Sequence, residues 1–262
     1  MNPRMPVLFL GHGNPMNAIT NKPWSQTWVE LGKQRPQPHA ILAISAHWYT
    51  AGTAVTAMQA PRTIHDFYGF PQALLNVQYP APGDPELSVR IQTLLNPLPI
   101  HADHDWGLDH GTWSILRHMF PDANIPVVQL SIDRTQPPAF HYELGQQLQT
   151  LRDEGVLIIG SGNIIHNLQA YQWKDATAQP YDWAQRFQNN ITTLIERREH
   201  DHLINYPALG QDAMLSVPTP EHYLPLLYIL GASTTEDIIS FHNADITGGS
   251  ISMLSVMFGN GA

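Results

Sequence analysis

Short apolar runs alternate along the chain with longer segments in which apolar residues recur at helical spacing. Four of the runs are bounded by turn residues and have the length of buried strands. They are Val7–Leu10, Ala40–Ser45, Val127–Ile132 and Val156–Gly160. Two further strand candidates are Thr53–Met58 and Ile251–Met257, the second of which follows Gly248 and Gly249. Together these runs predict the strands of a buried sheet.

Segments with helical spacing separate the predicted strands. In Pro85–Leu95 the apolar residues recur at helical intervals, and Asp84 is placed to cap the N-terminus. Similar spacing occurs in His110–Phe120, Pro138–Leu151 and Trp183–Arg198. The alternation predicts a single-domain α/β layered fold over residues 1–262, with a central, mostly parallel (mixed) sheet and helices on both faces. We expect the C-terminal strand to pair antiparallel at an edge of the sheet.

The composition narrows the functional classes. A chain of 262 residues with 43 % hydrophobic residues is long enough to bury one core. Its net charge of -9 argues against nucleic-acid binding and against anionic membrane surfaces. The absence of cysteine excludes disulfides, thiolate metal sites and cysteine nucleophiles. Val7–Leu10 is too short for the apolar region of a signal peptide, and no apolar window has transmembrane length, so we expect a cytoplasmic protein.

Histidine is unusually frequent, and three of the 14 histidines follow strand candidates directly. These are His12, His47 and His166. Ligands of open α/β sheets bind beyond the carboxyl ends of the strands, so three such histidines predict one convergent cluster. A single histidine after a strand is usually structural, but three from separate strands make coincidence a weaker explanation.

A fourth histidine comes from the segment Pro218–Tyr223. Thr219 is placed as an N-cap and Pro220 as the first helical residue, so Glu221 and His222 are expected in the first turn of a helix. Successive helical residues diverge by about 100°, so only one of the two should face a metal. The alternative is that Glu221 complements the helix dipole and His222 lies on the surface.

Two further segments carry candidate substrate-binding residues. Asp109 is placed to cap a helix, and His110 is expected to face the pocket as a hydrogen-bond donor to the substrate. A polar and aromatic loop contains His65, Phe67 and Tyr68 and could cover an aromatic substrate. The alternative for this second segment is an ordinary packed loop.

Histidine ligands suit zinc, iron and copper, and do not suit calcium or magnesium. Two histidines with one carboxylate are the usual ligands of Fe(II) in oxygenases, and Glu221 could supply that carboxylate. His222 would instead make the site all-histidine, and three histidines with one water describe a catalytic zinc equally well. The chain has no nucleophile elbow, P-loop or dinucleotide-binding motif. The residues therefore predict a metalloenzyme and leave oxidation and hydrolysis both open.

Five short segments carry the most distinctive residue patterns. They are Gly11–Met16 (GHGNPM), Ser45–Trp48 (SAHW), Asp109–Trp113 (DHGTW), Gly160–Leu168 (GSGNIIHNL) and Pro218–Tyr223 (PTPEHY). In this order they resemble the motifs of class III extradiol ring-cleavage dioxygenases, in particular the DOPA 4,5-dioxygenase branch. The resemblance extends from His12 to the C-terminal strand, which is essentially the whole chain.

The resemblance implies a divalent metal held by His12, His47 and His222, with His166 as acid/base or as a fourth ligand when zinc is bound. It implies that His110 hydrogen-bonds the substrate or O2. The expected substrates are a catechol such as L-DOPA and O2, with Fe(II) for oxygenation and zinc as a plausible bound ion. No nucleic-acid or membrane partner is implied, and the oligomeric state is left open.

The protocatechuate enzymes of the class use a glutamate ligand, so the adjacent pair Glu221 and His222 offers two assignments. We favour His222 as the ligand, which leaves Glu221 as a candidate substrate-binding residue. Two rival functions remain at this level. One is a zinc hydrolase that uses a metal-bound hydroxide, and the other is a non-catalytic binding protein of the same fold. The presence of all four histidines argues against the second.

Overall fold

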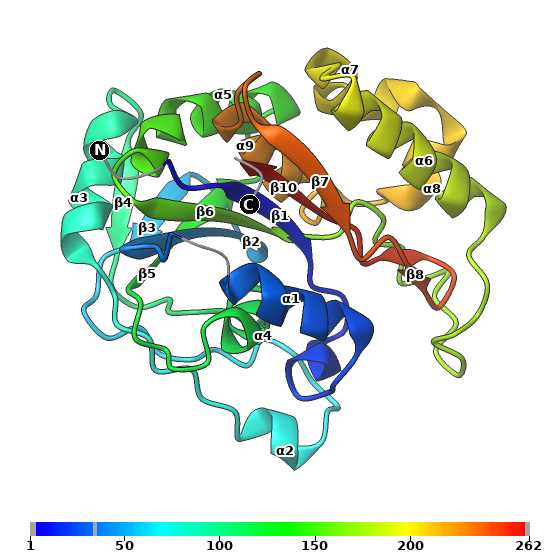
Figure 1. The fold of residues 1–262 in the computed structure, drawn as a ribbon, viewed down its shortest axis with the longest axis horizontal. Coiled ribbons are helices and arrows are strands. Elements are labelled where there is room, and N and C mark those ends of the chain that lie inside the picture. The colour runs from blue at the N-terminus through cyan, green and yellow to red at the C-terminus, as the bar shows by residue number, and fades with distance from the viewer. Residues whose placement is uncertain (1–3, 34–35, 260–262) are drawn as a thin grey trace.

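A mixed sheet runs through the centre of the molecule (Figure 1). The computed structural model describes residues 4–33 and 36–259, and in this part of the chain the sheet has eight strands in the order β4-β3-β5-β2-β6-β1-β10-β7. They are β1 (Val7–Gly11), β2 (Ala40–Thr50), β3 (Thr53–Thr56), β4 (Ile100–Asp103), β5 (Val127–Asp133), β6 (Val156–Gly162), β7 (Ile238–His242) and β10 (Ser255–Gly259). A small second sheet pairs β8 (Ile246–Thr247) with β9 (Ile251–Ser252).

The four central strands are parallel. β1 pairs with β6, β6 with β2, and β2 with β5, all in the same direction, so their carboxyl ends share one edge. Parallel strands covered on both faces read as continuous apolar runs, which is why the sequence locates them well. The predicted α/β class with a mixed sheet is confirmed.

The C-terminal part of the sheet differs from the prediction in two respects. β10 is antiparallel to β1, as expected, but it is not at the edge, because β7 pairs with its other side. The predicted strand Ile251–Met257 is also broken into β9 and β10. At the break, Ser252 Oγ accepts a hydrogen bond from the backbone N–H of Leu254, and this local bond competes with the strand ladder.

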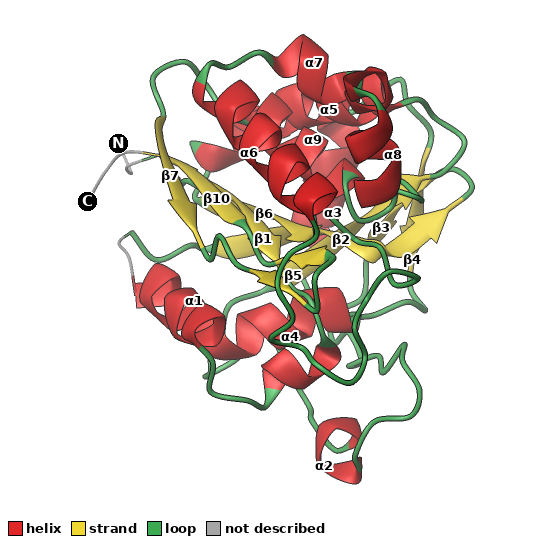
Figure 2. Ribbon diagram, turned by 90° about the vertical axis from the view of Figure 1, so that its right-hand side faces the viewer, coloured by secondary structure: helices red, strands yellow, loops and turns green. Residues whose placement is uncertain are grey.

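Helices cover both faces of the sheet (Figure 2). They are α1 (Pro23–Lys33), α2 (Gln72–Leu75), α3 (Pro85–Leu94), α4 (His110–Met119), α5 (Pro138–Leu148), α6 (Asp182–Glu196), α7 (His200–Ile204), α8 (Gln211–Ser216) and α9 (Leu224–Ala232). α1 and α4 lie on one face, and α5, α6 and α9 lie on the other. Alternate residues of β1 enter the two cores: Leu8 and Leu10 pack on the first face, and Val7 and Phe9 pack on the second.

The predicted helix starts are confirmed at two places and wrong at a third. Asp84 and Asp109 accept backbone N–H bonds from the third residue after each, so both are N-caps. Thr219 is not a cap, because its Oγ1 donates to Glu221 Oε1, and α9 begins only at Leu224. No helix in residues 4–33 or 36–259 combines the length and apolarity needed to cross a bilayer.

Candidate metal centre

His12 and His166 arrive at the shared carboxyl edge from neighbouring parallel strands. His12 follows β1 directly and is 2 % exposed. His166 follows the end of β6, and its backbone N–H donates to Ser216 O at 2.9 Å. Convergence of these two residues is what the strand-end argument predicts.

His47 reaches the same edge by a different route. The sequence predicts that it follows a strand, but the structure places it inside β2. The register between β2 and β5 shifts between Ile44 and Tyr49, and His47 lies within this irregular stretch. An irregularity of this kind re-aims side chains next to a site. The strand therefore continues past the point at which the apolar run ends.

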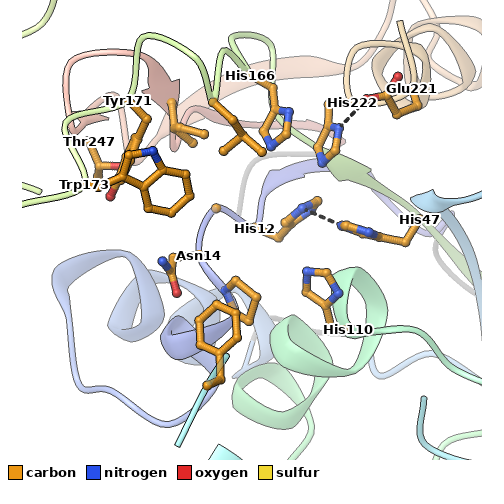
Figure 3. A pocket seen from close by; sticks show the side chains of 15 residues that line it. His12, Asn14, His47, His110, His166, Tyr171, Trp173, Glu221, His222 and Thr247 are labelled. Carbon is orange, nitrogen blue, oxygen red and sulfur yellow. Dashed lines mark hydrogen bonds and ion pairs between the residues drawn. The ribbon is translucent and has the colours of Figure 1, made fainter. Parts of the chain in front are cut away.

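Three of the histidines present nitrogen atoms to one point (Figure 3). One nitrogen from each of His12, His47 and His222 lies within 4.8 Å of the others. Nε2 of His12 and Nε2 of His47 are 3.1 Å apart. Two imidazoles bound to a tetrahedral ion at about 2.0–2.1 Å are separated by about 3.3 Å, so this spacing fits a shared metal.

The ring proton of His12 is fixed by Ser161. Ser161 Oγ donates to the backbone carbonyl of Gly111 at 2.6 Å and lies 2.9 Å from Nδ1 of His12. Since the hydroxyl proton is already used, Ser161 accepts the proton of Nδ1–H, and Nε2 keeps its lone pair. Burial, followed by the neighbouring histidines, holds the pKa of His12 well below its usual value. A neutral ring with a free Nε2 is the form that binds a metal.

The ring proton of His222 is positioned in the same way, here by a carboxylate. Its Nδ1 lies 3.2 Å from Glu221 Oε1, which favours the proton on Nδ1 and leaves Nε2 free. Burial, followed by His166, lowers the pKa of His222 well below its usual value. The segment lies close against β6, since a Cβ at Gly162 would overlap the backbone carbonyl of His222. Glu221 thus lies behind His222, in a turn before α9 rather than in its first turn.

His166 stacks on His222 and faces the cavity. The two ring centroids are 3.5 Å apart and the planes differ by 9°. Burial lowers the pKa of His166 to about 4, so the ring is neutral at pH 7. One of its nitrogens can donate a hydrogen bond while the other accepts one. His166 and Glu221 also form a second group of three potential ligand residues with His222.

Asp66 is a site residue that the sequence did not single out. Its Oδ2 lies 3.1 Å from Nδ1 of His47 and 2.9 Å from Nδ1 of His110. Burial opposes its ionisation, but His110 and His47 outweigh burial and hold the pKa of Asp66 below its usual value. No local pattern marks this residue, because its partners are distant in the chain.

The histidines form one end of a cavity of about 400 Å³, a size typical of small-molecule sites. The residues that line it are His12, Gly13, Asn14, Pro15, His47, Phe70, His110, His166, Leu168, Tyr171, Trp173, Glu221, His222, Thr247 and Ile251. Tyr171 and Trp173 form a wall at the end away from the histidines (Figure 3). Among the described residues that form this lining, Glu221 is the one carboxylate, and none is a lysine or an arginine.

The aromatic loop that precedes α2 contributes a different residue from those expected. Phe70 lines the cavity. His65 bonds instead to the backbone carbonyl of Val77, and Phe67 is buried against the His110 ring at a centroid distance of 5.3 Å. Tyr68 is 95 % exposed and lies on the surface. The wall formed by Tyr171 and Trp173 was missed, because isolated aromatic residues in a loop carry no periodic signal.

Residues 11–254 match the family model described as the catalytic LigB subunit of aromatic ring-opening dioxygenase. The chain belongs to this family. Within the LigB family it is 49 % identical over 260 residues to a 4,5-DOPA dioxygenase extradiol of Escherichia coli (strain K12), covering 98 % of this chain and 95 % of that protein. A protein of the same name from Beta vulgaris is 39 % identical over 233 residues, covering 87 % and 86 %. A crystal structure of an uncharacterized protein from Escherichia coli K12 superimposes with a TM-score of 0.86 at 45 % identity, covering 98 % and 100 %.

These similarities confirm the predicted relation to class III extradiol dioxygenases and their DOPA branch. The chain is therefore an extradiol ring-cleavage dioxygenase, and neither the zinc hydrolase nor the non-catalytic alternative is supported. LigB membership implies an aromatic substrate, O2 and a divalent metal, and the group of His12, His47 and His222 is suited to hold such an ion.

Proposed function

We propose that this LigB dioxygenase cleaves the ring of L-DOPA or a closely similar catechol between carbons 4 and 5. The metal ligands are His12, His47 and His222, each through Nε2. The proposal rests on one observation. A nitrogen atom from each of these three histidines lies within 4.8 Å of the others, at one end of a mostly apolar cavity. Fe(II) in this position would supply the redox chemistry between catechol and O2, and Zn(II) would fit the same nitrogens.

The side chains around the ligands have separate tasks. His166, a neutral ring stacked beside His222, can take a proton from a catechol hydroxyl and return it to the opening ring. His110 is 4 % exposed and faces the cavity, where it can hydrogen-bond the substrate. The apolar walls limit the water around the reacting atoms, which strengthens these hydrogen bonds. The catechol hydroxyls belong at the histidine end.

The substituent of the ring then extends towards Tyr171 and Trp173. Asn14 and Thr247 lie at this end as neutral hydrogen-bonding groups. Since no lysine or arginine in the described part of the chain lines the cavity, a carboxylate attached directly to the ring would meet no cationic partner there. The tail of L-DOPA carries an ammonium group, which an aromatic face can bind, and a carboxylate, which Asn14 and Thr247 can hydrogen-bond at the same end. These features support L-DOPA over ring-carboxylated catechols such as protocatechuate.

The test is an oxygen-uptake assay on iron-loaded protein, with L-DOPA and protocatechuate compared at equal concentration. We expect one O2 consumed per L-DOPA, a conjugated semialdehyde that absorbs in the visible, and much lower turnover of protocatechuate. Trp173→Ala should raise KM for L-DOPA by about 2–5-fold, corresponding to about 0.5–1 kcal/mol for an exposed cation–π contact.

Two controls frame this assay. His12→Ala should abolish oxygen uptake, whereas replacement of the exposed His101 by alanine should leave it unchanged. Absence of oxygen uptake with every catechol tried, on folded and iron-loaded protein, would refute the proposal. Faster turnover of protocatechuate than of L-DOPA would refute the substrate assignment alone.

A further inference from the structure

The carboxylate of Asp66 contacts two histidines of the cavity at once. Its Oδ2 lies at ion-pair distance from both, 3.1 Å from Nδ1 of His47 and 2.9 Å from Nδ1 of His110. Its Oδ1 accepts a hydrogen bond from the backbone N–H of His110 at 2.9 Å. The Asp66 side chain is 19 % exposed, so water competes little for these oxygens. Both rings therefore share one carboxylate neighbour.

That neighbour determines where each ring carries its proton. A carboxylate beside a neutral imidazole favours the proton on the nearer nitrogen, which is Nδ1 in both rings. For His47 the lone pair is then on Nε2, the atom that approaches Nε2 of His12. For His110, Nδ1 is shielded from solvent and lies 2.9 Å from Asp66 Oδ2, an ion-pair contact rather than an aligned hydrogen bond, so Nε2 is the nitrogen left for the cavity. A neutral ring in this form accepts a hydrogen bond at Nε2 and cannot donate one there.

We propose that Asp66 is a positioning residue that holds the ring protons of His47 and His110 on Nδ1. His47 then offers Nε2 to the metal, and His110 accepts a hydrogen bond from a substrate hydroxyl instead of donating one. Asp66 itself does not line the cavity. The inference rests on the proposed function for the metal ligand, and it reverses the donor role expected for His110 from the sequence.

Asp66→Asn separates this role from simple packing. The amide has the shape of the carboxylate but only one acceptor oxygen. If that oxygen keeps the hydrogen bond from the backbone N–H of His110, the amide NH2 group faces Nδ1 of both histidines. Because an NH2 group only donates, each Nδ1 must then accept a hydrogen bond and carries no proton. Both rings then carry the proton on Nε2, where His47 needs a lone pair. The opposite amide orientation places an N–H against the backbone N–H of His110, which leaves two donors facing each other.

The experiment uses zinc-loaded protein, because zinc is diamagnetic and its binding does not depend on turnover. Two-bond correlations between ring protons and ring nitrogens in NMR spectra identify the protonated nitrogen of each histidine. The His110 signals are assigned from their loss in His110→Gln. We expect Nδ1–H for His110 in the wild-type protein and Nε2–H in Asp66→Asn. Zinc affinity, measured by competition with a chelator, should fall by about 10–100-fold in Asp66→Asn.

Asp103→Asn is the matched control. It makes the same change of charge and shape, but Asp103 Oδ1 accepts only from the backbone N–H groups of Asp105 and Trp106. Its zinc affinity and the His110 signals should match those of the wild-type protein. The melting temperature of metal-free Asp66→Asn should stay within a few degrees of wild type, because the backbone hydrogen bond is retained.

Three results would overturn parts of this reasoning in distinguishable ways. A proton on Nε2 of His110 in the wild-type protein would overturn the proposal without any variant, even if Asp66→Asn fails to fold. Wild-type zinc affinity in a folded Asp66→Asn protein would overturn the role of Asp66 towards His47. If the wild-type protein binds no zinc, the proposed metal site fails instead, and the protonated nitrogen of His110 still decides the role of Asp66.

Discussion

Gly111, in the first turn of helix α4, lies against the candidate metal ligand His47. A Cβ atom at this position would be 2.5 Å from Ser45 Oγ and 2.9 Å from His47 Cδ2. Carbon atoms pack at about 3.5–4.0 Å, so in Gly111→Ala the His47 ring has to move by about 0.6 Å or more. Metal–ligand distances tolerate about 0.2 Å, so this displacement should weaken metal binding. We expect zinc affinity to fall by at least about 10-fold, which is comparable to removing a hydrogen-bond partner of a metal-binding histidine.

The same substitution should lower stability only modestly. Overpacking in a core typically costs about 1–3 kcal/mol, and the preference of alanine over glycine in a helix returns about 0.5–1 kcal/mol. A net loss of up to about 2.5 kcal/mol corresponds to a decrease in melting temperature of up to about 10 °C for a protein of this size. Thermal unfolding of the metal-free protein measures this effect separately from metal affinity.

Gly145→Ala is the control for overpacking alone. A Cβ at Gly145 would overlap the backbone carbonyl of Tyr228 where α5 packs on α9, and neither residue lines the cavity. This variant should lose stability without losing zinc affinity. If Gly111→Ala loses stability like the control but binds zinc as tightly as the wild-type protein, the argument that α4 positions His47 is refuted.

Three further predictions concern the same site. His222→Ala should weaken zinc binding more than Glu221→Ala, whose effect should stay near 10–100-fold because Glu221 acts behind the ligand; the opposite order in a chelator competition would exchange the two assignments. His166→Gln should keep most of the iron but lose turnover by about 10²-fold or more, whereas a parallel loss of iron and activity would make His166 a ligand. Chelation should lower the melting temperature, because an ion at 100 times its Kd stabilises the fold by about 2.7 kcal/mol; a His12→Ala protein should not respond, and an equal response would exclude His12 as a ligand.

The positions of the four central strands and the gathering of histidines at their carboxyl ends followed from the sequence alone. Buried parallel strands must be apolar on both faces, so β1, β2, β5 and β6 were recognisable as short apolar runs. The rule that ligands gather beyond the carboxyl ends of such strands then brought His12 and His166 together correctly. Asp84 and Asp109 could be predicted as caps because their partners are three residues away.

The tertiary structure decided the features that depend on contacts between distant segments. The sequence placed His47 after its strand and Glu221 in a helical turn, whereas pairing with β5 extends β2 through His47 and α9 starts only after Glu221. Asp66 and the wall residue Trp173 carry no local signal at all, since an isolated polar or aromatic residue in a loop has no periodicity.

The tautomers of the histidines show most clearly the difference between what the sequence determines and what the tertiary structure decides. The sequence determined that imidazoles would meet, because that depends on burial patterns within each segment. Which nitrogen of each ring is free depends on the acceptor within about 3 Å of the other nitrogen. Those acceptors, Ser161 for His12 and Asp66 for His47, come from elsewhere in the chain, so only the folded arrangement could identify them.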